Sequence, residues 1–163
     1  MDLPQEAWSE FNVAMVGATA ALAGLVIVAA SVNIADIVKA SSLTSRLASG
    51  ISSLVLAIVG SAVGLVPGLG LSAYGIIMIA GALVAAVFAG AATRRIAENR
   101  HPENRLRALK AALGFAAPLS YVVGGLLLLT DAPAGLAWFA AGSLIAIIAA
   151  LLISWIVLVE VLR

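Results

Sequence analysis

The sequence predicts an all-α bundle of five transmembrane helices, with the N-terminus outside and the C-terminus inside. Hydrophobic residues make up 63% of its 163 residues and charged residues only 10%, whereas soluble domains carry about 45–50% and about 25% of these classes. The mean hydropathy is +1.16. Too few charges remain to cover a surface that faces water. The composition therefore excludes a nucleic-acid-binding protein, a secreted disulfide-bonded domain and a cytosolic enzyme.

Five stretches are long enough to cross a bilayer, which takes about 20 predominantly apolar residues. The breaks between them come at Pro67-Gly68 and at Asp131 and Pro133, residue types that end helices and form turns. We expect residues 1–163 to form a single transmembrane domain without a cleavable signal peptide, because the first residues include the acidic Asp2 and Glu6. The predicted helices cover residues 11–38, 47–66, 71–92, 111–130 and 135–159.

All basic residues fall on one side of this predicted bundle. Lysine and arginine are retained in the cytoplasm during membrane insertion, so this side, with the basic loop 93–110, is predicted to be cytoplasmic. The nine residues are Lys39, Arg46, Arg94, Arg95, Arg100, Arg105, Arg107, Lys110 and Arg163.

The basic loop is also a candidate contact for anionic lipid headgroups. The alternative is that it is a topology signal, which is sufficient to explain it. We expect the third and fourth helices to extend past the membrane and to turn near residues 99–101. The candidate headgroup contacts are Arg94, Arg95, Arg100, Arg105, Arg107 and Lys110.

The aromatic residues predict the depth of several side chains. Trp8, Tyr74 and Trp138 fall at the predicted outer interface and Trp155 near the inner one, where an apolar ring with one polar atom is favoured. Tyr121 falls in the middle of the fourth helix, so its hydroxyl needs a partner inside the bundle.

Small residues recur at spacing four on nearly every predicted helix, which places them on one helix face. Such faces let two helices approach closely in lipid. They indicate either contacts within one chain or an interface between copies, and we expect a homo-oligomer. The candidate packing or interface positions are Gly17, Gly24, Gly60, Gly64, Gly81 and Gly142.

The first predicted helix carries the most polar series of residues. Asn12 and Thr19 are seven apart and Asn33 and Asp36 are three apart, so each pair shares a helix face. These four residues are candidates for lining a narrow pore. The alternative is that Asn and Asp cap helix ends and that Thr bonds to its own backbone. Asp36 and Lys39 can form an ion pair.

No constellation of catalytic residues is present in the predicted membrane interior. The chain has no cysteine and one histidine, His101, and no charged residue falls at mid-membrane depth, where proton relays and ion-coupled carriers need one. We therefore expect no catalytic, metal or cofactor site, and a protein that is not an enzyme.

The first third of the chain resembles a family of small bacterial multi-pass membrane proteins, some of which are labelled as modulators of a membrane protease. The resemblance rests on Trp8-Ser9-Glu10-Phe11, on residues 17–26 and on Ser31-Val32-Asn33-Ile34. It implies a location in the bacterial cytoplasmic (inner) membrane and transfers no catalytic residue.

Two functional hypotheses follow from these observations. The first is a non-enzymatic, homo-oligomeric structural or accessory protein that contacts membrane lipids or another membrane protein. The second is a passive homo-oligomeric channel for ions or small solutes, lined by the first helix. Neither hypothesis involves a cofactor or a nucleic-acid partner.

Overall fold

A computed structural model of the chain describes residues 4–39, 41–98 and 107–161. Within these ranges the chain is helical, and no strand occurs, which confirms the predicted all-α fold. A short 3₁₀ helix, η1, precedes six α-helices. The elements are η1 Glu6–Trp8, α1 Ser9–Val32, α2 Ile34–Lys39, α3 Ser41–Val63, α4 Leu71–Glu98, α5 Arg107–Leu129 and α6 Ala134–Val161.

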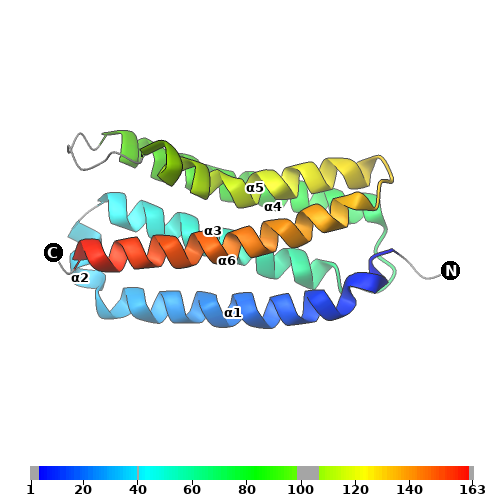
Figure 1. Ribbon diagram of the computed structural model, residues 1–163, viewed down its shortest axis with the longest axis horizontal. Coiled ribbons are helices and arrows are strands. Elements are labelled where there is room, and N and C mark those ends of the chain that lie inside the picture. The colour runs from blue at the N-terminus through cyan, green and yellow to red at the C-terminus, as the bar shows by residue number, and fades with distance from the viewer. Residues whose placement is uncertain (1–3, 40, 99–106, 162–163) are drawn as a thin grey trace.

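Five of these helical segments are long and apolar enough to cross a membrane, as predicted. They run side by side along the long axis of the bundle, and α1 begins at one end while α6 finishes at the other (Figure 1). Their apolar spans are Glu6–Val32, Ser42–Val63, Leu71–Arg95, Ala111–Leu129 and Ala134–Val159.

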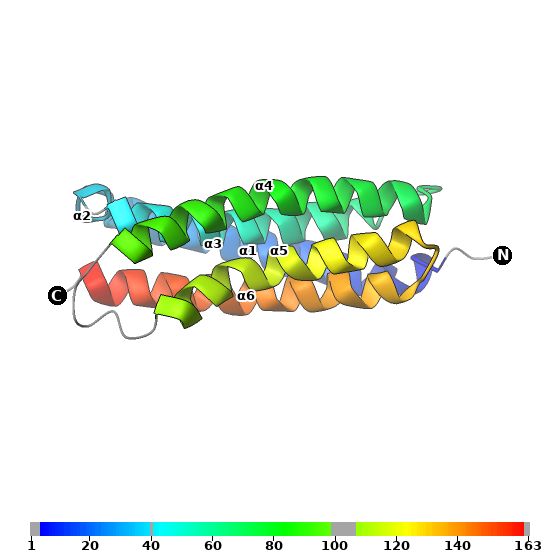
Figure 2. The same ribbon diagram turned by 90° about the horizontal axis from the view of Figure 1, so that it is seen from above.

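Helices α3, α4, α5 and α6 form a closed ring, which we call the four-helix core. α3 and α5 each pack against both α4 and α6, and α4 and α6 lie at opposite edges of the bundle (Figure 2). α1 stands outside this ring, packs mainly on α3 and touches α6 only slightly. One flank of α1 therefore meets the core, while the rest of its surface has no helix against it.

The two ends of the bundle differ in charge. We call the end that holds α2 and the last turn of α6 the basic end (Figure 1). Lys39, Arg46, Arg94 and Arg95 lie at this end, in α2, the first turns of α3 and the last turns of α4. At the opposite end the chain turns between α3 and α4 and between α5 and α6, where Gly68 has a φ of 73° and Asp131 a φ of 56°.

The boundaries at the basic end differ from those expected. The first predicted helix, 11–38, is interrupted at Asn33, whose side-chain Nδ2 donates to the carbonyl of Ala29 at 3.1 Å. A local bond of this kind competes with the helical backbone pattern. Helix α3 begins at Ser41 rather than at residue 47. Helices α4 and α5 extend beyond the predicted apolar stretches, since α4 runs to Glu98 and α5 begins at Arg107, and the turn expected between them lies outside the described residues.

Two glycine pairs mark where helices of the core come closest. A Cβ added to Gly75 on α4 would lie 2.8 Å from the carbonyl oxygen of Gly125 on α5, and one added to Gly125 would lie 2.8 Å from that of Gly75. Gly124 and Gly135 meet in the same reciprocal way between α5 and α6. At these points backbone packs directly on backbone, which small residues permit in membrane helices.

Candidate functional site

At the centre of the four-helix core, buried hydroxyl side chains form hydrogen bonds within the bundle. Tyr121 lies fully buried with its hydroxyl 2.7 Å from Ser143 Oγ, and Ser143 Oγ donates to the carbonyl of Phe139 at 3.0 Å. Because the Ser143 hydrogen is used in that bond, Tyr121 is the donor to Ser143. This confirms that the Tyr121 hydroxyl has a partner inside the bundle.

Tyr74 lies in the first turn of α4, at the end of the bundle opposite the basic end. Its side chain is buried among the helices and only 2% exposed. Its hydroxyl donates to the carbonyl of Gly60 at 2.7 Å. Tyr74 and Tyr121 both pack on Phe139, with ring centroids 4.9 and 5.4 Å away. Tyr74 thus belongs to the interior aromatic cluster, because a partner carbonyl on α3 replaces the water that its hydroxyl would otherwise require.

Four of the six candidate glycines are used inside the chain. Added Cβ atoms at Gly60 and Gly142 would lie 3.0 and 2.9 Å from the ring of Tyr121, and one at Gly64 would lie 2.6 Å from Asn12 Nδ2. At Gly81 the nearest atom would be a Leu56 methyl at 3.0 Å. These four positions therefore hold the helices of one subunit together.

The other two candidate glycines, Gly17 and Gly24, behave differently. Both are exposed on α1, and an added Cβ at either position would meet nothing within 4 Å. Ala21 lies between them and is exposed as well. We call these three residues the outer face of α1.

The four candidate pore residues divide into two groups. Asn12 and Thr19 are buried within the subunit, and Thr19 Oγ1 donates to the carbonyl of Met15 at 2.5 Å. Asn33 and Asp36 lie at the basic end, where Asp36 pairs with Lys39 at 2.8 Å, as expected. Thr19 and Asn33 both bond to their own backbone, which is the alternative that the sequence left open.

The candidate headgroup contacts are placed only in part. Arg94 and Arg95 are exposed in the last turns of α4, at the basic end. Arg107 and Lys110 belong to the beginning of α5, but their side chains lie outside the described part of the chain. Arg100 and Arg105 lie outside it entirely.

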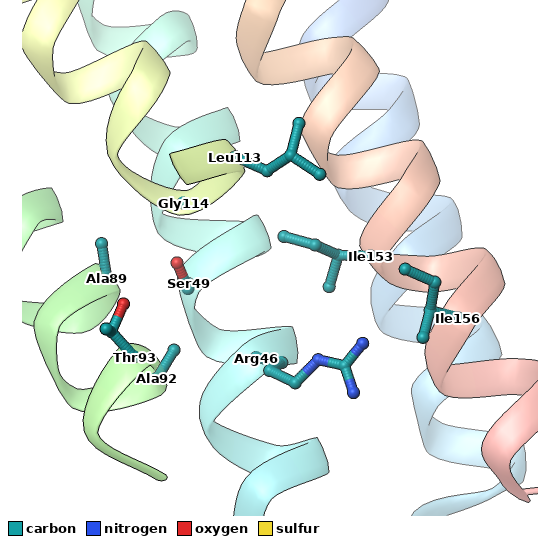
Figure 3. A pocket seen from close by; sticks show the side chains of 9 residues that line it. All are labelled: Arg46, Ser49, Ala89, Ala92, Thr93, Leu113, Gly114, Ile153 and Ile156. Atoms are coloured by element: carbon teal, nitrogen blue, oxygen red, sulfur yellow. The ribbon is translucent and has the colours of Figure 1, made fainter. Parts of the chain in front are cut away.

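A small cavity opens at the basic end of the core, lined mainly by apolar residues together with Arg46, Ser49 and Thr93 (Figure 3). Arg46 and Ser49 lie one turn apart on α3, and the Arg46 guanidinium extends toward α6, while Ser49 faces α4 and α5 (Figure 3). Arg46 is only 6% exposed. Sequence reasoning placed Arg46 in a loop, and its spacing of three and seven from Ser49 and Ser53 was the signal that could have placed it on the buried face.

The cavity has the size of a water site. Its volume is about 20 Å³, which is room for about one water molecule. Ser49 Oγ is buried and has no hydrogen-bond partner within the described residues. Gly114 also lines the cavity, and its carbonyl lacks the usual helical donor because Pro118, four residues later in α5, has no N–H.

Gly114→Ala is expected to raise the free energy of unfolding by about 0.5–1 kcal/mol, the usual gain for this exchange in a helix. The new Cβ would lie 3.4 Å from Ser49 Oγ and 3.6 Å from Ala89 Cβ, which is ordinary contact. Thermal unfolding in detergent measures the change. A loss of stability would show that the cavity wall cannot take a methyl group.

A larger groove runs between α1 and α6 near the basic end, and we call it the α1–α6 groove. Its volume is about 260 Å³. Val26, Ala30 and Asn33 line one side, and Leu151 and Ser154 line the other. The groove exists because α1 packs on α3 and barely contacts α6.

No family model, curated protein or solved structure matches the chain. The class of protein therefore follows from the fold itself. Five apolar helices, a core held by small residues and buried hydroxyls, and basic residues at one end define a multi-pass integral membrane protein.

Proposed function

We propose that the protein is a non-enzymatic, homo-oligomeric accessory protein of a bacterial cytoplasmic membrane, which contacts lipid or another membrane protein. The observation that carries this proposal is the outer face of α1, where small residues face away from the subunit. The basic end is proposed to face the cytoplasm, in keeping with the retention of basic residues on that side.

The outer face of α1 has no use within the subunit. Gly17, Ala21 and Gly24 share one side of the helix, opposite the buried Thr19 and Ala23 that pack toward the core. Glycine within a helix costs about 1 kcal/mol relative to alanine. Gly60, Gly64 and Gly142 offset this cost through close packing in the core, but Gly17 and Gly24 do not. Contact with a second α1 would give them the same function, since small faces drive helix association in lipid.

The mass of the complex released from lipid nanodiscs tests this proposal. The wild type is expected to appear as a multiple of the 16.4 kDa subunit. The double substitution Gly17→Leu with Gly24→Leu is expected to return it to a single subunit without unfolding, because both positions have open space around them. Ala80→Leu, at another exposed site on α4, is the matched control and should leave the mass unchanged.

Disulfide cross-linking gives a second, independent measurement, because the chain contains no cysteine. Ala21→Cys is expected to form a covalent dimer in the membrane under mild oxidation, and Ala80→Cys is not. A wild type that stays a single subunit, together with equal cross-linking at both sites, would refute the homo-oligomer.

A passive channel lined by the first helix has weaker support. Asn12 and Thr19 are buried within the subunit rather than on the outer face of α1. The accessory proposal predicts that Thr19→Ala and Asn33→Ala leave ion flux through reconstituted vesicles at its background level. A change in flux without loss of assembly would favour the channel instead.

A further inference from the structure

Two arginines continue the outward-facing side of α4, which lies at one edge of the bundle (Figure 2). Val84, Val87 and Phe88 on this helix are exposed, Val87 to 71%, so this face is open to the surroundings of the subunit. Arg94 follows Val87 by seven residues, and both are exposed. Arg95 follows Phe88 by the same spacing, which returns to the same face of a helix. The apolar face of α4 therefore ends in two adjacent cations.

Other basic side chains described at this end contribute little exposed charge. Lys39 pairs with Asp36 at 2.8 Å, and Arg46 is buried against α6. Among the side chains that the structure describes, the exposed positive charge of the basic end is thus concentrated on α4. The end formed by α1 and α2 is close to neutral.

The depth of the two arginines matches the headgroup layer of a membrane. Arg95 is the last residue of the apolar span of α4, which has 25 residues and is therefore ~37 Å long at ~1.5 Å per residue. A centred span of this length extends ~3–4 Å beyond each side of a hydrocarbon core of ~30 Å. Val87 lies two turns earlier, within the hydrocarbon. A molecule that covers Val87 and both arginines must therefore be apolar along one part and polar at one end, as a phospholipid is.

We propose that this surface binds an anionic phospholipid of the cytoplasmic leaflet. We call it the α4 lipid face, and it consists of Val84, Val87, Phe88, Arg94 and Arg95. An acyl chain lies along the apolar residues, and the guanidinium groups donate to the phosphate oxygens, for which their planar N–H donors are suited. An acidic protein of the cytoplasm would meet the end of the bundle, whereas this surface lies on its flank. The proposal rests on the membrane location and orientation of the proposed function and adds the class of lipid.

Native mass spectrometry of lipid retention tests the site. The full-length protein is reconstituted in nanodiscs of equal parts dioleoyl phosphatidylglycerol and dioleoyl phosphatidylcholine, which share their acyl chains and their phosphodiester and differ in net charge. The wild type is expected to retain phosphatidylglycerol in excess. Arg94→Gln and Arg95→Gln are each expected to lower this excess about fivefold, which is the ratio for about 1 kcal/mol per cation near anionic lipid. The double variant should lose most of the excess.

Three further variants control the charge and the topology. Lys39→Gln removes one positive charge from the same end and should leave the lipid ratio unchanged, because Lys39 is already paired with Asp36. The double variant Arg94→Lys, Arg95→Lys keeps the charge that orients the chain and should keep most of the excess. Glu98 follows Arg94 by four residues and can compete for it, so Glu98→Gln is expected to raise the excess.

Three results would overturn the proposal. The first is equal retention of the two lipids by the wild type, which would leave the arginines available to an acidic protein. The second is an unchanged excess in the double glutamine variant. The third is equal losses in Arg94→Gln and Lys39→Gln, which would show a general effect of net charge. Failure of the oligomer is read separately, from the mass of the complex, because the lipid ratio is counted per subunit in any assembly.

Discussion

Replacing Tyr121 with alanine is expected to lower the free energy of unfolding by about 3 kcal/mol, the lower end for removal of a buried aromatic ring. The lower end applies because a ring that leaves the core enters lipid rather than water, so mainly packing is lost. Tyr121 is fully buried. Its ring lies against Gly60 on one side and Gly142 on the other, and it stacks on Phe139 at 5.4 Å with an angle of 30°.

Reversible unfolding in a mixed detergent series measures this effect, and two variants control it. Tyr121→Phe keeps the ring and removes only the bond to Ser143, so we expect a loss of about 0.5–1 kcal/mol. Trp155→Ala removes a larger ring that is 67% exposed, and its effect on stability should be small. If the two alanine variants lose equal stability, the interior aromatic cluster does not hold the core.

Gly125→Ala is expected to cost about 2 kcal/mol, within the usual range for overpacking a close-packed interior. The added Cβ would lie 2.6 Å from Ile79 Cγ1 and 2.8 Å from the carbonyl oxygen of Gly75. The isoleucine can turn aside, but the carbonyl is part of α4, so the two helices must separate. The aligned helices then lose contact along their length.

The same unfolding measurement compares Gly125→Ala with Gly114→Ala on the same helix. The chemical change is identical, yet we expect opposite signs, because the neighbours of a Cβ at Gly114, Ser49 Oγ and Ala89 Cβ, would be at ordinary contact distance. Gly75→Ala should reproduce the loss from the other side of the α4–α5 contact. Equal effects at Gly114 and Gly125 would contradict the close backbone approach.

The number of membrane helices could be predicted from the sequence, whereas their boundaries at the basic end could not. Hydropathy finds residues that prefer lipid, and Pro67 and Asp131 end the apolar runs. The stretch from Ser41 to Arg46 is polar and therefore fell outside the predicted helix, although it is helical. The hydropathy of a segment predicts whether its side chains face lipid or water. It does not predict where the helix ends, because a helix can continue into a polar environment. The break at Asn33 depends on one local side-chain bond that hydropathy does not register.

The sequence predicted which helix faces carry the candidate residues, but it did not predict what those faces contact. Spacing four places Gly60 and Gly17 each on a small-residue face, but it does not say which neighbour meets that face. The structure uses Gly60 against Tyr121 and leaves Gly17 open. The close backbone contact between α4 and α5 at Gly75 and Gly125 escaped prediction, because its two members lie on different helices. The α1–α6 groove escaped for the same reason, since it depends on where α1 sits.

The position of α1 outside the four-helix core has a consequence for synthesis. α1 leaves the ribosome before the four core helices, and α3, against which it packs, follows after the short α2. The ring, by contrast, closes through contacts between α3 and α6, and α6 is translated last. The side of α3 that bears Gly50, which packs against Ile153 of α6, therefore has an incomplete set of neighbours until α6 has been made. Assembly of the core is thus a late, largely post-insertional event, whereas the α1–α3 pair can dock while translation continues.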